Sequence, residues 1–139
     1  MKTCIVIDPE APILPVIPLD EAGSVVGWVA NGGNFEEQIV ALAPGLVVLD
    51  LRRCGNRCGD YVVRVRRCAP AAKILVLGPP DDLDTAVTAL RTGVAGYITH
   101  PENLGRALRS LGSGDMFITQ TGWAALRRHQ LGPHQAGAE

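Results

Sequence analysis

Polar side chains that could do chemistry follow several short apolar runs in this sequence. Asp8 comes directly after the first run, Asp50 after the third, and His100 after the run that ends at Thr99. In an open parallel sheet, functional groups gather at the carboxyl ends of the strands, so these residues are candidates for one site. Each Asp alone is typical of a cap or a turn, and no Ser or Cys nucleophile clearly faces His100. Two Asp residues that both follow strands of one sheet are less easily explained as caps or turns.

The cysteines suggest a second kind of chemistry. Cys54 and Cys58 are four positions apart in an arginine-rich stretch, and guanidinium groups lower the pKa of a neighbouring thiol. A thiol or metal sensor that uses these two residues is therefore one hypothesis, although the Cys-x₃-Cys spacing is unusual for zinc. Cys68 should lie at the opposite end of the next helix and Cys4 near the start of a strand. We expect Cys4 and Cys68 to be small core residues.

The apolar runs predict an α/β domain in which strands and helices alternate. Residues 46–49 and 74–77 are uninterrupted apolar tetrads, which are typical of strands covered on both faces in a parallel sheet. Five strands are expected, at residues 4–7, 25–29, 46–49, 74–77 and 96–99. Four helices are expected: one capped by Asn34 with Phe35, Ile39 and Leu42 inward, one capped by Asp60 with Val62 and Val65 inward, one from Asp81 or Asp82 to Gly93, and one with Leu104, Ala107, Leu108 and Leu111 on its inner stripe.

One connection and the composition narrow the class of protein further. Residues 9–23, where the first crossover helix should be, contain prolines spaced by three, so we expect that helix to be shortened or replaced.

The chain has 139 residues, 47% of them hydrophobic, and a net charge of −1, which gives no general attraction to nucleic acid or anionic lipid. No apolar run approaches the roughly 18 residues needed to span a bilayer. We expect a soluble, cytoplasmic protein that does not contact a membrane.

The order and spacing of three segments carry a resemblance to a known family. Residues 47–52, 74–77 and 89–98 resemble a bacterial response-regulator receiver domain. Residues 104–119 are similar to the end of receivers that precede a LuxR-type helix-turn-helix. The resemblance implies a flavodoxin-like, doubly wound, five-stranded parallel sheet of order 2-1-3-4-5, with Asp50 as the phospho-acceptor. It divides the chain into a receiver-like domain, residues 1–120, and a C-terminal linker or tail, residues 121–139.

Several positions depart from the pattern that this resemblance implies. The family has two adjacent acids after the first strand, which help to hold the Mg²⁺ that phosphorylation needs, whereas here Asp8 is followed by proline, with Glu10 as the nearest substitute. The family's switch hydroxyl corresponds to Gly78 and its phosphate-binding lysine to His100, while Tyr97 matches. We therefore expect that Asp50 is not phosphorylated, and that a loop arginine within residues 52–57 holds it.

These observations favour a non-enzymatic, regulatory receiver domain of a transcription regulator that works without phosphorylation and needs no cofactor. It would act by dimerising or by binding a partner or small ligand. Arg91, Arg106 and Arg109, facing Asp81, Asp82 and Asp84, would form the surface of a homodimer. One alternative is a working phospho-acceptor that uses Asp50 and Mg²⁺, and a second is the sensor with Cys54 and Cys58. A DNA-binding domain, if there is one, would lie beyond residue 139.

Overall fold

A six-stranded parallel sheet forms the centre of the molecule. In a computed structural model, which describes residues 3–7, 25–30, 34–53, 58–79, 82–112 and 117–118, the strand order is β2-β1-β3-β4-β5-β6. The strands are β1 (Thr3–Ile7), β2 (Val25–Ala30), β3 (Leu46–Asp50), β4 (Lys73–Leu77), β5 (Gly96–Ile98) and β6 (Phe117–Ile118). All neighbouring strands run parallel.

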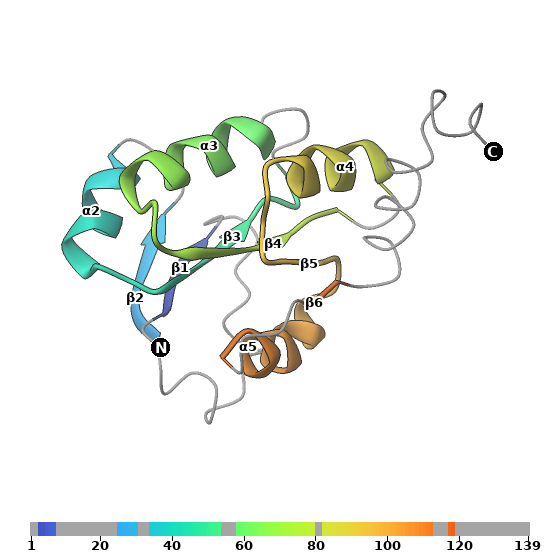
Figure 1. Cartoon of the computed structure of the whole chain (residues 1–139). Helices are drawn as coiled ribbons and strands as arrows, with labels where there is room; N and C mark the ends of the chain where they lie inside the picture. The colour runs from blue at the N-terminus through green and yellow to red at the C-terminus, as the bar shows by residue number, and fades with distance from the viewer. Residues whose placement is uncertain are drawn as a thin grey trace.

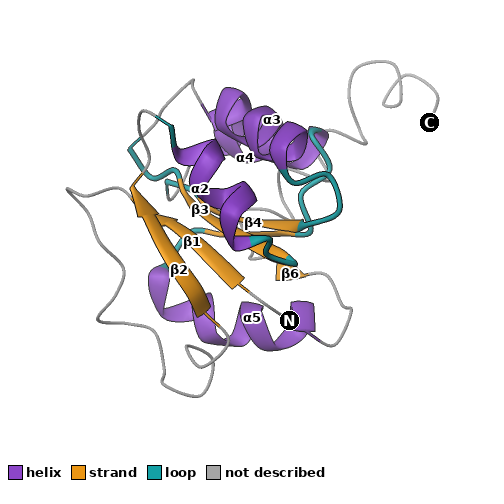
Figure 2. Cartoon of the chain, turned by 90° about the vertical axis from the view of Figure 1, so that its left-hand side faces the viewer, coloured by secondary structure: helices purple, strands orange, loops and turns teal. Residues whose placement is uncertain are grey.

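The helices cover the sheet from both sides (Figures 1 and 2). They are α2 (Phe35–Leu42), α3 (Cys58–Cys68), α4 (Leu83–Arg91) and α5 (Leu104–Gly112), with a short 3₁₀ turn at Pro101–Asn103 before α5. Figure 1 shows α2, α3 and α4 on one face and α5 on the other. This layering confirms the predicted doubly wound α/β fold, because parallel strands need crossover helices that bury both faces of the sheet.

Alternate residues of the central strands supply two separate cores. Val47 and Leu49 of β3 pack with buried residues of α2, α3 and α4. Leu46 and Val48 point to the other face and pack with Leu104 and further residues of α5. The five residues of β3 are all buried, as the uninterrupted apolar tetrad predicted.

The strand order 2-1-3-4-5 is confirmed, but the expected count of five strands was wrong. The sixth strand, β6, continues the sheet beyond β5, with Phe117 beside Gly96 and Ile118 beside Tyr97. It is only two residues long. A segment this short has no alternating or continuous apolar pattern of its own, so only its pairing with β5 defines it as a strand.

The predicted helix starts have mixed outcomes. Asp82 caps α4, because its carboxylate accepts a hydrogen bond from the Thr85 amide at 3.0 Å. Asn34 precedes α2 as predicted, but its side chain makes no capping bond to the backbone and instead contacts Glu37 and Gln38. The expectation that Asp60 caps α3 was wrong: α3 begins at Cys58, which leaves Asp60 in its first turn.

Several predictions concern residues outside the described ranges. They include Asp8, Glu10, Cys54, Asp81, the proline-containing segment at residues 9–23 and the tail at residues 121–139. Within the part of the chain that the structure describes, no helix has the length and apolar character needed to cross a membrane.

Candidate functional site

The carboxyl ends of β3, β4 and β5 lie side by side and bring the candidate residues to one edge of the sheet. Asp50 is in register with Leu77, and Leu77 with Ile98. Two backbone hydrogen bonds of 2.8 Å extend this edge past the strand ends, from the Leu51 amide to the Leu77 carbonyl oxygen and from the Gly78 amide to that of Ile98. The structure therefore brings Asp50, Gly78 and the residues after Ile98 together, as the sequence predicted.

Asp50 is buried and bound by an arginine of its own loop. Its side chain has 0% exposure, and that of Arg52 has 22%. The guanidinium binds both carboxylate oxygens, with Nε donating to Oδ1 at 2.9 Å and Nη2 to Oδ2 at 2.8 Å. The Arg52 backbone amide also donates to Oδ1, at 3.3 Å. The expectation that an arginine within residues 52–57 holds Asp50 is thus confirmed.

This ion pair limits the chemistry that Asp50 can perform. A bidentate arginine–carboxylate pair is among the stronger charge-assisted contacts in proteins, and here it engages both oxygens. A divalent cation or an incoming phosphoryl group would need the same oxygens. The described residues of this edge therefore do not fit Mg²⁺ while Arg52 stays in place.

Gly78 and Tyr97 form the second feature of the edge. Tyr97 of β5 is completely buried. Its ring lies so close to Gly78 that a Cβ atom there would be 2.6 Å from Cζ and 2.9 Å from Cε2, and closer still to the hydroxyl oxygen. Real Cβ atoms essentially never come within 3.0 Å of another heavy atom in this way. The Tyr97 ring thus occupies the space that a side chain at position 78 would take.

His100 lies at the same edge but faces solvent. The residue is exposed, and its Nδ1 lies 3.0 Å from the hydroxyl oxygen of Thr99, which is buried. His100 was expected to follow a strand that ends at Thr99, but β5 ends one residue earlier, at Ile98.

Cys4 and Cys68 lie away from this edge, while the side chain of Cys58 is outside the described part of the structure. Cys4 of β1 is buried, and its burial, with a smaller contribution from Cys68, raises the pKa of its thiol to about 11. Cys68 ends α3 and lines an apolar cavity of about 240 Å³ between α2 and the loop before β4. Burial also raises the pKa of the Cys68 thiol. Both residues pack in the core, as predicted, and their raised pKa values are opposite to those of a reactive thiol.

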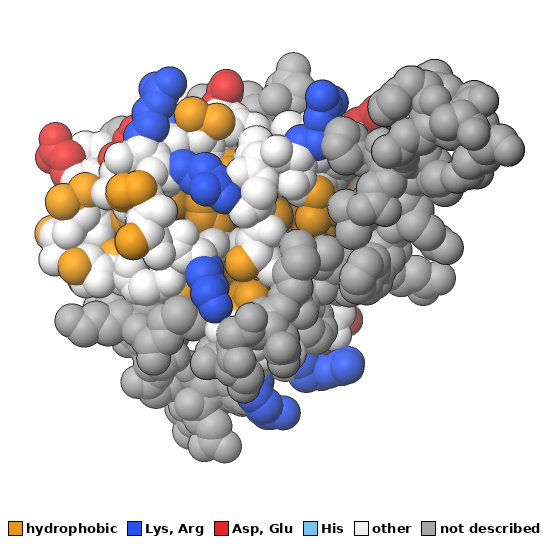
Figure 3. Space-filling view, viewed as in Figure 1, with side chains coloured by type: hydrophobic (Ala, Val, Ile, Leu, Met, Phe, Trp, Pro, Cys, Tyr) orange, Lys and Arg blue, Asp and Glu red, His pale blue; other side chains and the backbone are white. Residues whose placement is uncertain are grey.

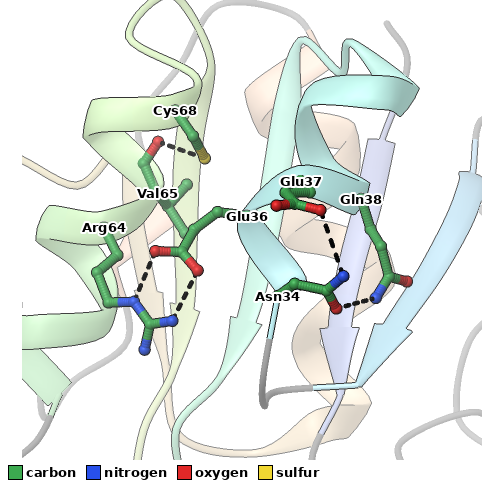
Figure 4. A network of polar contacts seen from close by, with 7 residues as sticks. All are labelled: Asn34, Glu36, Glu37, Gln38, Arg64, Val65 and Cys68. Atoms are coloured by element: carbon green, nitrogen blue, oxygen red, sulfur yellow. Dashed lines mark hydrogen bonds and ion pairs between the residues drawn. The ribbon is translucent and has the colours of Figure 1, made fainter.

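A contact between α2 and α3 was not predicted from the sequence. Arg64 of α3 donates to both carboxylate oxygens of Glu36 in α2, at 2.8 and 2.6 Å (Figure 4). The Arg64 guanidinium also lies over the Phe35 ring, 4.4 Å from its centroid, and 5.6 Å from that of Tyr61. Side-chain hydrogen bonding to Arg64 lowers the pKa of Glu36. The contact joins positions 28 residues apart, so no local sequence pattern could have revealed it.

The residues predicted for a dimer surface lie on two elements. Arg91 is exposed at the end of α4, and Arg106 and Arg109 are exposed on α5. Of the acidic residues expected to face them, Asp84 is exposed on α4, while Asp82 is engaged by Thr85 in the helix cap. The arginines are therefore accessible, and part of the expected acidic side is used inside α4.

Comparisons with known proteins agree with this architecture. No protein-family model matches the chain. It is 30% identical over 100 residues to the nitrate/nitrite response regulator NarL of Escherichia coli, a match that covers 70% of this chain and 46% of NarL. It is 26% identical over 107 residues to the oxygen regulatory protein NreC of Staphylococcus haemolyticus, a match that covers 74% of this chain and 49% of NreC. The chain thus spans about half the length of these curated relatives.

Solved structures show the same fold at lower identity. The RcsB response regulator of Salmonella typhimurium superimposes with a TM-score of 0.75 at 19% identity, covering 99% of this chain and 75% of that chain. A LuxR-family two-component response regulator from Aurantimonas superimposes with a TM-score of 0.73 at 22% identity. This match covers 94% of this chain and 98% of that chain. The structural matches show that the chain has the fold of a receiver domain. The sequence matches relate it to response regulators.

Proposed function

We propose that this receiver domain regulates transcription without phosphorylation of Asp50 and performs no catalysis. The observation that carries the proposal is the bidentate Asp50–Arg52 pair, which engages both oxygens of the acceptor carboxylate. Gly78 adds to it, because it has no hydroxyl to bind a phosphoryl oxygen. Each lost partner of the developing charge costs a few kcal/mol in such a reaction, so phosphoryl transfer should be negligible.

Intact-mass spectrometry tests this proposal directly. The protein is incubated with Mg²⁺ and a small phosphodonor, and no added phosphoryl mass is expected. The Asp50→Asn variant, treated in parallel, reports any modification elsewhere in the chain. A phosphoryl group that appears in the wild-type protein and disappears in Asp50→Asn would instead establish the working phospho-acceptor.

We also propose that the domain acts as a homodimer through α4 and α5. The exposed Arg91, Arg106 and Arg109, with Asp84 on the same side of α4, offer both signs of charge to a two-fold partner. One RcsB structure is described as two dimers bound to two parallel DNAs. Sedimentation at low and high ionic strength should show a dimer that weakens with salt and with Arg106→Glu/Arg109→Glu. A strict monomer at tens of micromolar would contradict this part of the proposal.

The remaining partners follow from the relatives. Because the chain spans about half their length, we propose that a DNA-binding domain follows residue 139 in the full-length protein, which would be cytoplasmic. On the face in Figure 3, Lys and Arg side chains are scattered singly between apolar ones. This arrangement does not favour DNA contacts on this face, since phosphate binding needs clustered basic residues. A small ligand that adjusts dimerisation is a further possibility that ligand-dependent sedimentation would test.

A further inference from the structure

At three glycines of the described residues, a side chain from another element lies close to the position that a Cβ atom would take. A Cβ atom at Gly59 of α3 would lie 3.1 Å from the Thr88 methyl carbon of α4. At Gly78 it would overlap the Tyr97 ring of β5, and after α4, at Gly93, it would lie 2.8 Å from Nη2 of Arg66. Each contact joins the α4–β5 part of the chain to α3 or to the end of β4.

The contact at Gly78 is the tightest of the three. The backbone there is held by the bond from its amide to the Ile98 carbonyl oxygen, 2.8 Å long. Gly78 is not among the described residues with positive φ, so its conformation is open to any residue. Space alone therefore requires glycine at position 78, and the Tyr97 ring is what fills that space.

The other two contacts hold α4 against α3 near both ends of α3. Gly93 follows α4 with φ of 82°, a conformation that favours glycine. Its carbonyl oxygen accepts a hydrogen bond from Arg66 Nη2 of α3. Nearer the start of α3, the missing Cβ of Gly59 lets the Thr88 methyl approach closely. Figure 1 shows α3 and α4 side by side on one face of the sheet.

We infer that α4 and β5 form one unit that is locked against α3 and β4 by these three contacts, with the Tyr97 ring in the space above Gly78 as the main one. The exposed surface of α4 then keeps a single arrangement, whatever the chemical state of Asp50. This inference rests on the proposed function, because it explains how the dimer surface stays formed without phosphorylation. Close-packed interiors change between discrete arrangements, so filling the space at position 78 must displace the ring.

The test follows the Tyr97 ring by NMR in protein labelled with ¹³C at tyrosine Cζ. The chain has two tyrosines, so Tyr61 provides an internal reference. In the wild-type protein, Tyr97 should give one resonance. In Gly78→Ala that resonance should move or divide while the Tyr61 resonance stays in place, and the thermal midpoint should fall by about 5–10 °C. A Tyr97 resonance that is unchanged in Gly78→Ala would overturn the inference.

Two further variants separate displacement of the ring from general damage. Leu108→Ala removes packing from the core on the α5 side of the sheet, which does not include Tyr97, so it should lower stability while the Tyr97 resonance stays in place. Gly78→Ala/Tyr97→Leu should recover stability relative to the sum of the single changes, because the new methyl group takes the vacated space. If Gly78→Ala does not fold, folding of this double variant supports the lock, and its failure to fold overturns it.

A final arm distinguishes failure of the lock from failure of the proposed function. The wild-type spectrum is recorded with and without beryllofluoride and Mg²⁺, and one unchanged Tyr97 resonance is expected. A second Tyr97 resonance under either condition overturns the lock, even if mass spectrometry finds no phosphorylation. Phosphorylation of Asp50 with an unchanged Tyr97 resonance overturns the proposed function but leaves the lock standing.

Discussion

Removing the Arg52 guanidinium should destabilise the domain far more than neutralising its partner. In Arg52→Ala the buried Asp50 carboxylate, with 0% side-chain exposure, loses both guanidinium bonds and keeps the 3.3 Å bond from the residue 52 amide. In Asp50→Asn the amide oxygen can still accept from Arg52, whose side chain is 22% exposed and can also reach water. The first change leaves a buried charge without its counter-ion, whereas the second removes the charge.

The magnitudes follow from the burial of the two groups. Breaking a buried ion pair by removing one partner costs about 3–5 kcal/mol, and the partial exposure of Arg52 places this case at the lower end, near 3 kcal/mol. Asp50→Asn should cost about 1 kcal/mol, the net value of an ordinary hydrogen bond. Arg52→Ala/Asp50→Asn should cost less than Arg52→Ala alone, because no buried charge remains, which gives a coupling energy of about 2 kcal/mol.

Urea denaturation followed by far-ultraviolet circular dichroism measures these differences. With a slope of about 2 kcal/mol per molar urea, Arg52→Ala should lower the midpoint by about 1.5 M. The control is Arg67→Ala, which removes an exposed arginine in the last turn of α3 and should change stability by less than about 0.5 kcal/mol. Equal effects of Arg52→Ala and Arg67→Ala, or strict additivity with Asp50→Asn, would refute the reasoning.

Three further predictions concern other contacts. Burial raises the pKa of Cys4 to about 11, so stability should be lost as pH rises from 9 to 11, and Cys4→Ala should flatten that loss in urea titrations. Bonding to Arg64 lowers the pKa of Glu36, so stability present above pH 4.5 should be lost at lower pH, and less steeply in Glu36→Gln. Asp82→Ala should cost about 1 kcal/mol by calorimetry, because the α4 cap is lost.

The parts of the fold that depend on local pattern could be predicted from the sequence. The tetrads 46–49 and 74–77 became buried central strands, because strands covered on both faces have no polar side to interrupt the run. The apolar stripe from Leu104 to Leu111 became the buried side of α5. The two-residue β6 was missed, because its strand character depends only on pairing with β5.

The candidate site was predictable in its residues but not in its contacts. The loop after Asp50 has arginines at positions 52, 53 and 57, and only the geometry of the turn determines which of them reaches the carboxylate. The approach of Tyr97 to Gly78 joins residues 19 positions apart. It exists because β4 and β5 pair with Leu77 beside Ile98, and pairing register is a tertiary property. The predictions for Asp8, Glu10, Cys54 and Cys58 stay predictions.

The Asp50–Arg52 ion pair and the Tyr97 ring over Gly78 both close the carboxyl edge of the sheet with groups of the chain itself. The Arg52 guanidinium compensates the buried charge of Asp50 from within the chain, so stability at this point does not need a cation. The Tyr97 ring fills the space over Gly78, so the packing there does not depend on a ligand. A signal that acts on this domain would have to displace a buried ion pair and a buried ring to enter at this edge. Residues on the outer surfaces of α4 and α5, such as Arg91, are exposed, so a partner could bind there without displacing either buried group.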